Sequence, residues 1–380
     1  MEASLPEEHR MLRDTVRGFI DEHLRPLEQQ VDQDDDIDPQ VLRALRQEAL
    51  KLGLYAYNMP ASVGGPGLSV SALCVMDEEM GTTSMPLGEA IGHLPGSLLA
   101  CNAEQRTWLL DPVMRAEKTV AYALTEPAAG SDLSAIRTRG EKVDGGWVLN
   151  GDKHFISNAE GADYIIILAV TDRDASLKGK LTTFIVDRRA EGLRFIRRFR
   201  KMGWRGYHLS AFSLDDVFVP DTHILGAPGE GFKTIMATVN SDRLFVACRC
   251  VGIARRLMEL AIPHVRERIT FGKPLAEHQA IQFQIADSDV ELDAARLLVR
   301  KAAELADAGS PEYRIAASRA KLFASEAAGR IADRVLQIFG GAGFMCDLPV
   351  ERFYRDVRGF RIGEGTSEMQ RIQIARSVLG

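Results

Sequence analysis

This sequence of 380 residues has few cysteines, no long apolar run and no excess of positive charge. The five cysteines are too scattered for a disulfide framework, and the C-x-C pair of Cys248 and Cys250 has no second cluster with which to bind zinc. The longest apolar run, residues 164–170, is far shorter than the ~20 residues that a membrane-spanning helix needs, so we expect no membrane span. With 47 Lys and Arg against 53 Asp and Glu, the chain lacks the basic excess of nucleic-acid-binding proteins.

Signals for export, phosphate loops and metal binding are missing as well. The first residues include Glu7, Glu8 and Asp14 and lack the basic start of a signal peptide, so we expect a cytoplasmic location. No G-x-G-x-x-G follows a predicted strand, and no G-x-x-x-x-G-K-[ST] occurs. None of the eight histidines has metal-ligand spacing with another ligand, so no metal is expected.

Three zones can be distinguished by the period of their apolar residues. Residues 1–118 are predicted to be an N-terminal helical domain, with a capping box at Ser4-x-x-Glu7 and helices near 41–54 and 68–80. Residues 119–226 are predicted to be a central β domain, and residues 227–380 a C-terminal four-helix bundle. This order gives an α+β fold and excludes the βαβ alternation of a nucleotide-binding sheet.

The β zone consists of short segments rich in β-branched residues, separated by turn residues. Strands are predicted at 147–151, 164–170, 181–186, 193–196 and 211–219. Asn150-Gly151 is typical of a hairpin turn, whose two central residues need positive φ. Strands so closely spaced, without intervening helices, favour an antiparallel sandwich or barrel.

The last zone is helical again. Its predicted helices run over 231–269, 275–308, 311–339 and 366–379. Pro263 falls inside the first of them, where we expect a bend.

Four segments carry residues suited to ligand binding, although each has an ordinary structural explanation. Residues 122–132 end a strand in a Pro/Gly loop with hydroxyls and acids, which equally fits a plain turn. Residues 151–159 place Phe155 and Ser157 on one face of a strand, which suits a flat heteroaromatic ring or simply a half-buried strand. Residues 266–274 gather cations that could bind phosphate or complement a helix dipole.

In the fourth segment, residues 361–370, Glu364 lies between two glycines just before the last helix. Flanking glycines let a ligand approach the backbone closely. The ordinary explanation is a turn in which Ser367 and Gln370 cap the helix.

Taken together, these segments resemble the acyl-CoA dehydrogenase family. The resemblance rests on Y-A-L-T-E-P-x-A-G-S-D, K-x-F-I-S-N-A, K-M-G-W-R-G, R-x-T-F-G-K, Q-I-x-G-G-x-G-F and E-G-T-S-E-M-Q, which occur in this order along the chain. It implies FAD, an acyl-CoA substrate, α,β-dehydrogenation to the 2-enoyl-CoA, an electron-transfer flavoprotein as partner, and a homotetramer built as a dimer of dimers.

The resemblance also assigns roles by position. Glu364 corresponds to the base that removes the α-proton, and a dry cleft would raise its pKa. Ser131 and Arg243 match positions near CoA, and Gly365 leaves room for the thioester. The positions that match FAD contacts are Tyr122, Leu124, Thr125, Phe155, Ser157, Thr366 and Glu368 and, across a subunit contact, Arg268, Thr270, Phe271, Gln279, Gln337 and Gly341.

The sequence departs from the family pattern at several of these positions. Asp242 stands where a minority of the family carries its base as a glutamate, and because Asp is one methylene shorter we favour Glu364. Phe155 replaces an aromatic that is often Trp. Tyr207 and His208 replace smaller polar residues, which leaves the acyl preference open, and the acyl pocket is expected near residues 87–100.

Two alternative functions are compatible with the same fold. An acyl-CoA oxidase or flavin monooxygenase of related shape would use oxygen, and the smaller shield at Phe155 leaves this open. A non-catalytic CoA-binding or assembly subunit would have lost the base or the FAD contacts, yet Glu364, Thr125, Arg268 and Gln337 are all present.

Overall fold

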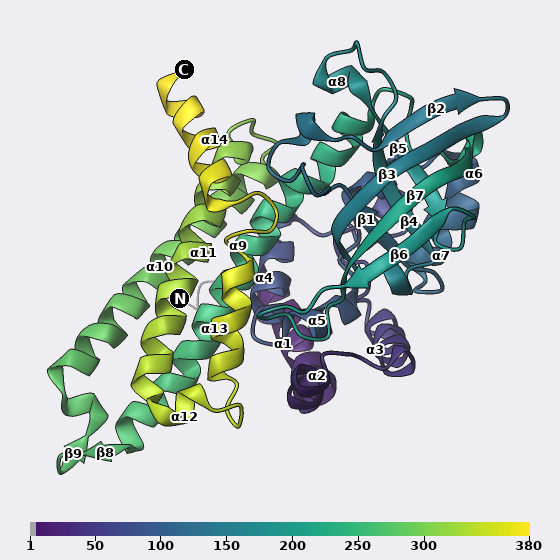
Figure 1. The fold of residues 1–380 in the computed structure, drawn as a ribbon. Coiled ribbons are helices and arrows are strands. Elements are labelled where there is room, and N and C mark those ends of the chain that lie inside the picture. Colours follow the sequence, from purple (N-terminus) through teal and green to yellow (C-terminus); the bar gives the residue numbers. More distant parts are fainter. Residues whose placement is uncertain (1–4) are drawn as a thin grey trace.

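A computed structural model describes residues 5–380, apart from the side chains of residues 237 and 240. Ser4 of the expected capping box therefore lies outside the described residues. The chain folds into a helical N-terminal part, a central sheet and a C-terminal bundle of long helices (Figure 1). This confirms the predicted α+β class, whereas the domain boundaries at 118/119 and 226/227 stay predictions. Among residues 5–380, the longest helices are too polar to cross a membrane.

The N-terminal part is held by an apolar core that begins in the first helical segment. Val16, Phe19, Ile20 and Leu24 are all buried there. Helix α3 begins after Asp38, whose carboxylate accepts the backbone N–H of Gln40 at 2.7 Å. The helices are α1 (Glu7–Phe19), α2 (Glu28–Asp34), α3 (Pro39–Lys51), α4 (Val70–Met80), α5 (Met85–Gly88), α6 (Ala103–Gln105) and α7 (Asp111–Met114).

The central part is a single seven-stranded sheet with the order β1-β4-β2-β3-β7-β6, to which β5 is added beside β4. Its strands are β1 (Val120–Ala123), β2 (Arg139–Val143), β3 (Gly146–Ser157), β4 (Tyr164–Val170), β5 (Leu181–Asp187), β6 (Leu193–Arg198) and β7 (Leu209–Pro220), and α8 (Leu177–Lys180) precedes β5. Most neighbouring strands are antiparallel, as expected, but β1 and β2 both pair with β4 in parallel. The β2–β3 hairpin lies between β1 and β4 in the chain, so β4 returns beside β1 in the same direction.

The predicted hairpin at Asn150-Gly151 is also wrong. The turn lies between Val143 and Gly146, at the Asp-Gly pair 144–145, which is an equally good turn signal. Asn150 and Gly151 instead sit inside β3, where the pairing with β7 shifts register. Gly151 is needed there because its φ is +146° and a Cβ would lie 2.6 Å from the Cα of Thr138.

The C-terminal part is the predicted bundle of long helices. Its elements are α9 (Gly231–Glu267), β8 (Ile269–Thr270), β9 (Lys273–Pro274), α10 (Gln279–Asp307), α11 (Tyr313–Phe339), α12 (Gly341–Phe344), α13 (Val350–Gly359) and α14 (Ser367–Leu379). Helix α11 packs closely against its neighbours because alanines such as Ala320, Ala324 and Ala328 are buried along it. Pro263 lies near the end of α9 and does not interrupt it, and a bend there stays a prediction.

Helix α13 was not predicted, although the sequence contains its signal. Val350, Phe353, Val357 and Phe360 are buried at three- and four-residue spacing. Charged residues between them obscure this stripe, and one of these, Arg352, is itself buried against Glu28 of α2, with Nη2 and Oε2 2.6 Å apart. The pair fixes the bundle to the N-terminal part.

A buried ion pair joins three segments of the central part. The ammonium group of Lys153, on β3, lies 2.8 Å from Oε1 of Glu126 and donates to the carbonyl oxygens of Leu124 at 3.1 Å and Leu168 at 2.8 Å. Glu126 in turn accepts the backbone N–H groups of residues 137 and 138 at 2.7 and 3.0 Å. The opposite charge therefore lowers the pKa of Glu126 despite its burial.

Replacing Lys153 by Met should destabilise the protein by about 3–5 kcal/mol, because the Glu126 carboxylate would be left buried without its partner. Denaturant unfolding of the parent and the variant measures this difference. Lys142→Met is the matched control, since its ion pair with Asp221 is half exposed and such pairs contribute less than about 1 kcal/mol. Equal losses in the two variants would contradict the importance of the buried pair.

Candidate functional site

The segment after β1 is held rigidly by the ion pair described above. Tyr122 belongs to β1, and Leu124 and Thr125 follow it directly. Lys153 binds the carbonyl of Leu124, and the backbone N–H of His154 donates to the carbonyl of Thr125 at 2.9 Å. A tight bridge between residues 126 and 129 then turns the chain. The predicted ligand-facing segment thus has a fixed backbone, and Ser131 lies exposed beyond the turn.

Phe155 is pushed out of the sheet by a bulge in β3. The pairing with β7 shifts register between Lys153 and Ile156, and Phe155 has a φ of +57°, which is unusual for a bulky side chain. Its ring is 54% exposed and contacts the rings of His154 and Phe199, with centroids 4.5 and 4.7 Å away. The bulge therefore presents a flat aromatic surface, although it replaces the regular alternation that the sequence predicted.

Glu364 lies on a strained loop that two side chains hold in place. Its φ is +52°, and that of Gly365 is +82°. The Gly365 carbonyl accepts the Lys321 ammonium at 2.7 Å and the Gln370 amide at 2.9 Å. Strain of this kind persists only where the surrounding structure enforces it. These contacts fix the backbone that carries the Glu364 carboxylate.

The last helix is capped by Thr366. Thr366 is the N-cap of α14, and its hydroxyl accepts the backbone N–H of Met369 at 3.3 Å. Ser367 donates instead to Glu326 of α11 at 2.7 Å, and Gln370 holds the Glu364 loop. Ser367 and Gln370 do not cap the helix, as the ordinary explanation of this segment supposed, because both side chains turn back toward α11 and the loop.

Tyr122, Ser157, Tyr207 and Glu364 lie together in space, although they come from four separate parts of the chain. Burial raises the pKa of Tyr122, and the negative charge of Glu364 raises it further. Burial likewise raises the pKa of Tyr207, to which Glu364 adds, while a hydrogen bond with Ser157 opposes the shift. Tyr207 is therefore hydrogen-bonded to Ser157 and also close to the carboxylate of Glu364.

The pKa of Glu364 is raised to about 7. The main cause is desolvation by the protein atoms that surround the carboxylate, followed by the negative charge of Asp242, while Lys321, His93 and Arg243 oppose the shift. Even so, the residue is exposed to solvent in the single chain, so a ligand can reach it. A carboxylate with a raised pKa is a stronger base than a surface glutamate.

The sequence did not predict the chain of side chains that extends from Asp242. The Asp242 carboxylate contacts Nε2 of His93 at 3.3 Å, and Nδ1 of His93 lies 3.1 Å from the Tyr57 hydroxyl, which donates to Asp77. His93 falls within the segment expected to line the acyl pocket, but its partners are 36 and 149 residues away. No local sequence pattern could have predicted these contacts, because the residues are far apart in the chain.

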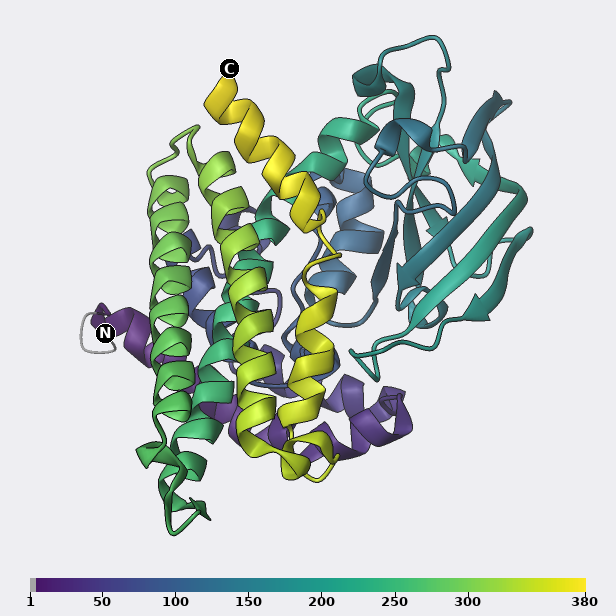
Figure 2. The same ribbon diagram turned by 60° about the vertical axis from the view of Figure 1, so that its left-hand side comes forward.

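The remaining predicted FAD contacts lie elsewhere. Both ribbon views place β8, β9 and α12 at the end of the bundle remote from the sheet (Figures 1 and 2). This end carries the predicted residues Arg268, Thr270, Phe271, Gln279, Gln337 and Gly341. Phe271 is 97% exposed there. One chain thus presents two separate groups of predicted cofactor residues, and Glu368, at the start of α14, belongs with the Glu364 loop.

Arg243 follows Asp242 on α9 and is only partly buried. Burial lowers its pKa, and the charges of Tyr313 and Glu364 oppose that shift. The structure thus brings Arg243 near the candidate base, and its predicted contact with CoA stays a prediction.

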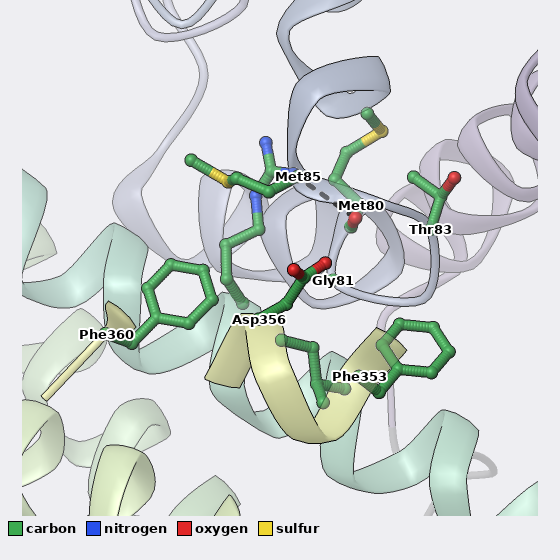
Figure 3. Close-up of a pocket in the computed structure, with 9 residues that line it drawn as sticks. Met80, Gly81, Thr83, Met85, Phe353, Asp356 and Phe360 are labelled. Carbon is green, nitrogen blue, oxygen red and sulfur yellow. Dashed lines mark hydrogen bonds between the residues drawn. The ribbon is translucent and has the colours of Figure 1, made fainter. Parts of the chain in front are cut away.

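Two hollows of the structure contain none of the predicted site residues. One, of about 10 Å³, is enclosed by Met80, Gly81, Arg249 and Asp356, among others, and has room for at most one water molecule (Figure 3). The other, of about 440 Å³, lies between α11 and α13, beside Met202. Within residues 5–380, no three His, Cys, Asp or Glu side chains are grouped as metal ligands.

Comparison with known proteins identifies the family. The models of the acyl-CoA dehydrogenase N-terminal, middle and C-terminal domains match residues 6–117, 121–217 and 229–379. The chain belongs to the acyl-CoA dehydrogenase family. It is 38% identical to a 3-(aryl)acrylate reductase of Clostridium sporogenes, over 98% of this chain and 99% of the relative.

Two further similarities extend over nearly the whole chain. The mitochondrial short-chain specific acyl-CoA dehydrogenase of Homo sapiens is 37% identical over 99% of this chain and 91% of its own length. The butyryl-CoA dehydrogenase structure of Megasphaera elsdenii superimposes with a TM-score of 0.91 at 31% identity and covers 99% of both chains. The chain is therefore an oxidoreductase of the CH–CH class with this family's fold.

The family is FAD-dependent, and the residues present fit this cofactor. The Tyr122 hydroxyl, the Gln370 amide oxygen and the Trp204 indole N–H are buried and have no hydrogen-bond partner among residues 5–380. Buried polar groups are nearly always paired, so these atoms indicate a missing ligand. The unpaired Tyr122 hydroxyl and the exposed ring of Phe155 are a polar group and a flat surface of the kinds that a flavin contacts.

The raised pKa of Glu364 has a consequence for stability. A carboxyl in the unfolded chain titrates near about 4.3, so between there and pH 7 the unfolded state loses its proton first, and stability falls as pH rises. Glu364→Gln abolishes this fall, and the FAD-loaded variant should therefore gain more Tm relative to the parent at pH 8 than at pH 5, where only a small part of the fall has occurred. Glu368→Gln is the control: the pKa of Glu368 is lowered, so its effect is the same at both pH values. A pH-independent effect of Glu364→Gln would contradict the shift.

Proposed function

We propose that this protein removes one hydrogen from each of the α- and β-carbons of an acyl-CoA thioester and forms the 2-enoyl-CoA. The observation that carries the proposal is the carboxylate of Glu364, which is held on a strained loop with its pKa raised to about 7. The α-proton of a thioester is weakly acidic, so a base poised near neutral pH is required to remove it.

The same loop offers a donor to the thioester oxygen. Among residues 5–380, no acceptor receives the backbone N–H of Glu364, whereas the Gly365 carbonyl is already bound by Lys321 and Gln370. A preorganised N–H stabilises the negative charge that develops on the oxygen when the α-proton leaves. FAD, when bound, accepts the β-hydrogen with its electron pair. Glu364 thus takes the proton, and its own backbone stabilises the remaining charge.

Ser131 and Arg243 are proposed to contact CoA, and the reduced cofactor is proposed to pass its electrons to an electron-transfer flavoprotein. Oxygen remains the second candidate acceptor, because the Phe155 ring that would cover the flavin is small and 54% exposed. Oxygen uptake after reduction distinguishes the two acceptors. The cytoplasmic location expected from the sequence stays a prediction.

The same site can catalyse the reaction in either direction, as dehydrogenation or as reduction. The Clostridium sporogenes relative is named a reductase of arylacrylates, whereas the human relative is named a dehydrogenase. Because a base that removes the α-proton in one direction returns it in the other, Glu364 serves both. An acyl-CoA panel should therefore include 3-phenylpropionyl-CoA besides straight short chains.

Glu364→Gln should abolish bleaching of the flavin band by every acyl-CoA that bleaches the parent under anaerobic conditions, because the amide cannot accept the α-proton. The absorption spectrum of the purified variant verifies that FAD is still bound. Asp242→Asn should retain bleaching; if it alone abolishes bleaching, Asp242 is the base. A parent protein whose FAD no acyl-CoA reduces would favour the non-catalytic alternative.

The separation of the two predicted FAD groups supports a site shared between chains. The remote end of the bundle exposes Phe271 and Phe344, which are 97% and 72% accessible. Along α10, Phe283, Val290 and Leu297 are exposed at seven-residue spacing, the period of a helix–helix seam. We propose that a second copy covers these surfaces within the expected homotetramer and brings its Arg268 group to the first copy's flavin.

Mixing two inactive variants tests this arrangement. Arg268→Ala weakens the remote group and Glu364→Gln removes the base, so each should be inactive alone. After joint refolding or co-expression, random pairing should restore about one site in four, because that site combines an intact loop with an intact remote group from its partner. Separately purified variants, mixed without exchange of subunits, are the control. No recovery in the mixed oligomers would place both groups in one chain's site.

A further inference from the structure

Lys321, on α11, is one of two fully buried lysines among residues 5–380. Its ammonium group donates to the carbonyl oxygen of Gly365 at 2.7 Å, and no carboxylate of the described residues lies within 4 Å of it. The other lysine, Lys153, has the carboxylate of Glu126 at 2.8 Å. Burying an ammonium without an opposite charge is strongly unfavourable. The place of Lys321 therefore calls for a functional reason rather than one of stability.

The carbonyl that Lys321 binds belongs to the residue directly after the candidate base. Glu364 and Gly365 have φ of +52° and +82°, so two consecutive residues are held in the left-handed region. A turn of this kind relaxes unless neighbouring groups hold it. The Gln370 amide also donates to the Gly365 carbonyl, at 2.9 Å, but carries no charge. Lys321 thus both clamps the turn and brings a positive charge to it.

The two ends of the loop are held independently of Lys321. The backbone N–H of Ser367 donates to the carbonyl of Arg361 at 3.1 Å, which closes the loop. Glu326, on α11, accepts the Ser367 hydroxyl at 2.7 Å and also pairs with Arg361. Loss of Lys321 should therefore free the turn at the centre of the loop and leave its two ends in place.

The charged and titratable groups around Lys321 and Glu364 come from several elements. Near Glu364 they are Lys321, Asp242, Arg243, His93 and the hydroxyls of Tyr122 and Tyr207, and near Lys321 they are Cys250, Arg243, Glu326 and Glu364. Burial lowers the pKa of Lys321 to about 8, so the ammonium stays mainly protonated at neutral pH. Its charge opposes the rise in the pKa of Glu364, because a nearby cation favours the ionised carboxylate.

We propose that Lys321 is a positioning residue for the candidate base. It fixes the turn of Glu364 and Gly365, and with it the Glu364 backbone N–H, while its charge keeps the carboxylate ionised and ready for the α-proton. The proton passes to Glu364 alone, and Lys321 keeps its own hydrogens throughout. This inference rests on the proposed function and adds a residue to its machinery.

Three substitutions separate the hydrogen bond of Lys321 from its charge. Lys321→Arg retains both, Lys321→Gln retains a donor without charge, and Lys321→Met retains neither. The readout is the rate of anaerobic flavin bleaching, as a function of pH, by an acyl-CoA that bleaches the parent. The Gln and Met variants should shift the midpoint of this profile upward by about one pH unit, because the carboxylate loses its cation. The Arg variant should keep the parent's midpoint.

The rate at saturating acyl-CoA provides a second readout in the same experiment. At pH 7 it should fall about five- to tenfold in Lys321→Gln and further in Lys321→Met, since the turn is then also released. The acyl-CoA concentration that gives half the maximal rate should change little. Ser325→Ala is the matched control: Ser325 is buried on the same helix, and its hydroxyl donates to the Leu322 carbonyl of that helix at 3.4 Å. It should keep the parent's rate and midpoint.

A double-mutant cycle measures the coupling of Lys321 and Glu364 without turnover. At pH 8, Glu364→Gln should raise the Tm of the FAD-loaded protein more in the Lys321→Gln background than in the parent, because the ionised carboxylate has lost its ammonium there. In the Ser325→Ala background the gain should equal that in the parent.

Three results would overturn the inference: the parent's midpoint and rate in both Lys321→Gln and Lys321→Met, additive effects of Glu364→Gln and Lys321→Gln on Tm, or loss of FAD from all three Lys321 variants, which would make the residue purely structural. Bleaching of the parent decides the proposed function separately. If no acyl-CoA bleaches the parent, the proposed function fails, and the Tm cycle still decides whether Lys321 is coupled to Glu364.

Discussion

The candidate site depends on the buried ion pair of Lys153 and Glu126. The ammonium group of Lys153, on β3, donates hydrogen bonds at the end of β1 and in the middle of β4. The carboxylate of Glu126 accepts from the backbone that leads into β2. A loop rich in Pro and Gly has little structure of its own, so these bonds give the segment around Thr125 its shape. With every polar atom of the pair satisfied, the charges can stay away from water.

Sequence periodicity predicted the framework well because that framework is repetitive. The strand at Tyr164–Val170 and the helix end at Phe339 were predicted at the residues where they occur. An apolar run of seven residues between turn signals and a long stripe of alanines each leave few alternatives. The Glu364 loop was found differently, through the family motif, since flanking glycines alone do not distinguish a catalytic loop from a plain turn.

Features that depend on distant contacts could not be predicted in this way. Asn150-Gly151 has the composition of a turn, yet β7 pairs along its whole length and turns the glycine into a bulge. His93 meets Asp242 only because the N-terminal part packs on α9. In both cases the local residues allow several conformations, and tertiary packing selects one.

The distance between the β-domain residues and the remote hairpin of β8 and β9 has a consequence for cofactor retention. If each chain supplies only part of the contacts to a given FAD, then affinity for the cofactor and affinity between chains are linked. Dilution that separates the chains also releases the flavin, and added FAD holds the assembly together. The yellow colour of the protein would then report how many chains are assembled.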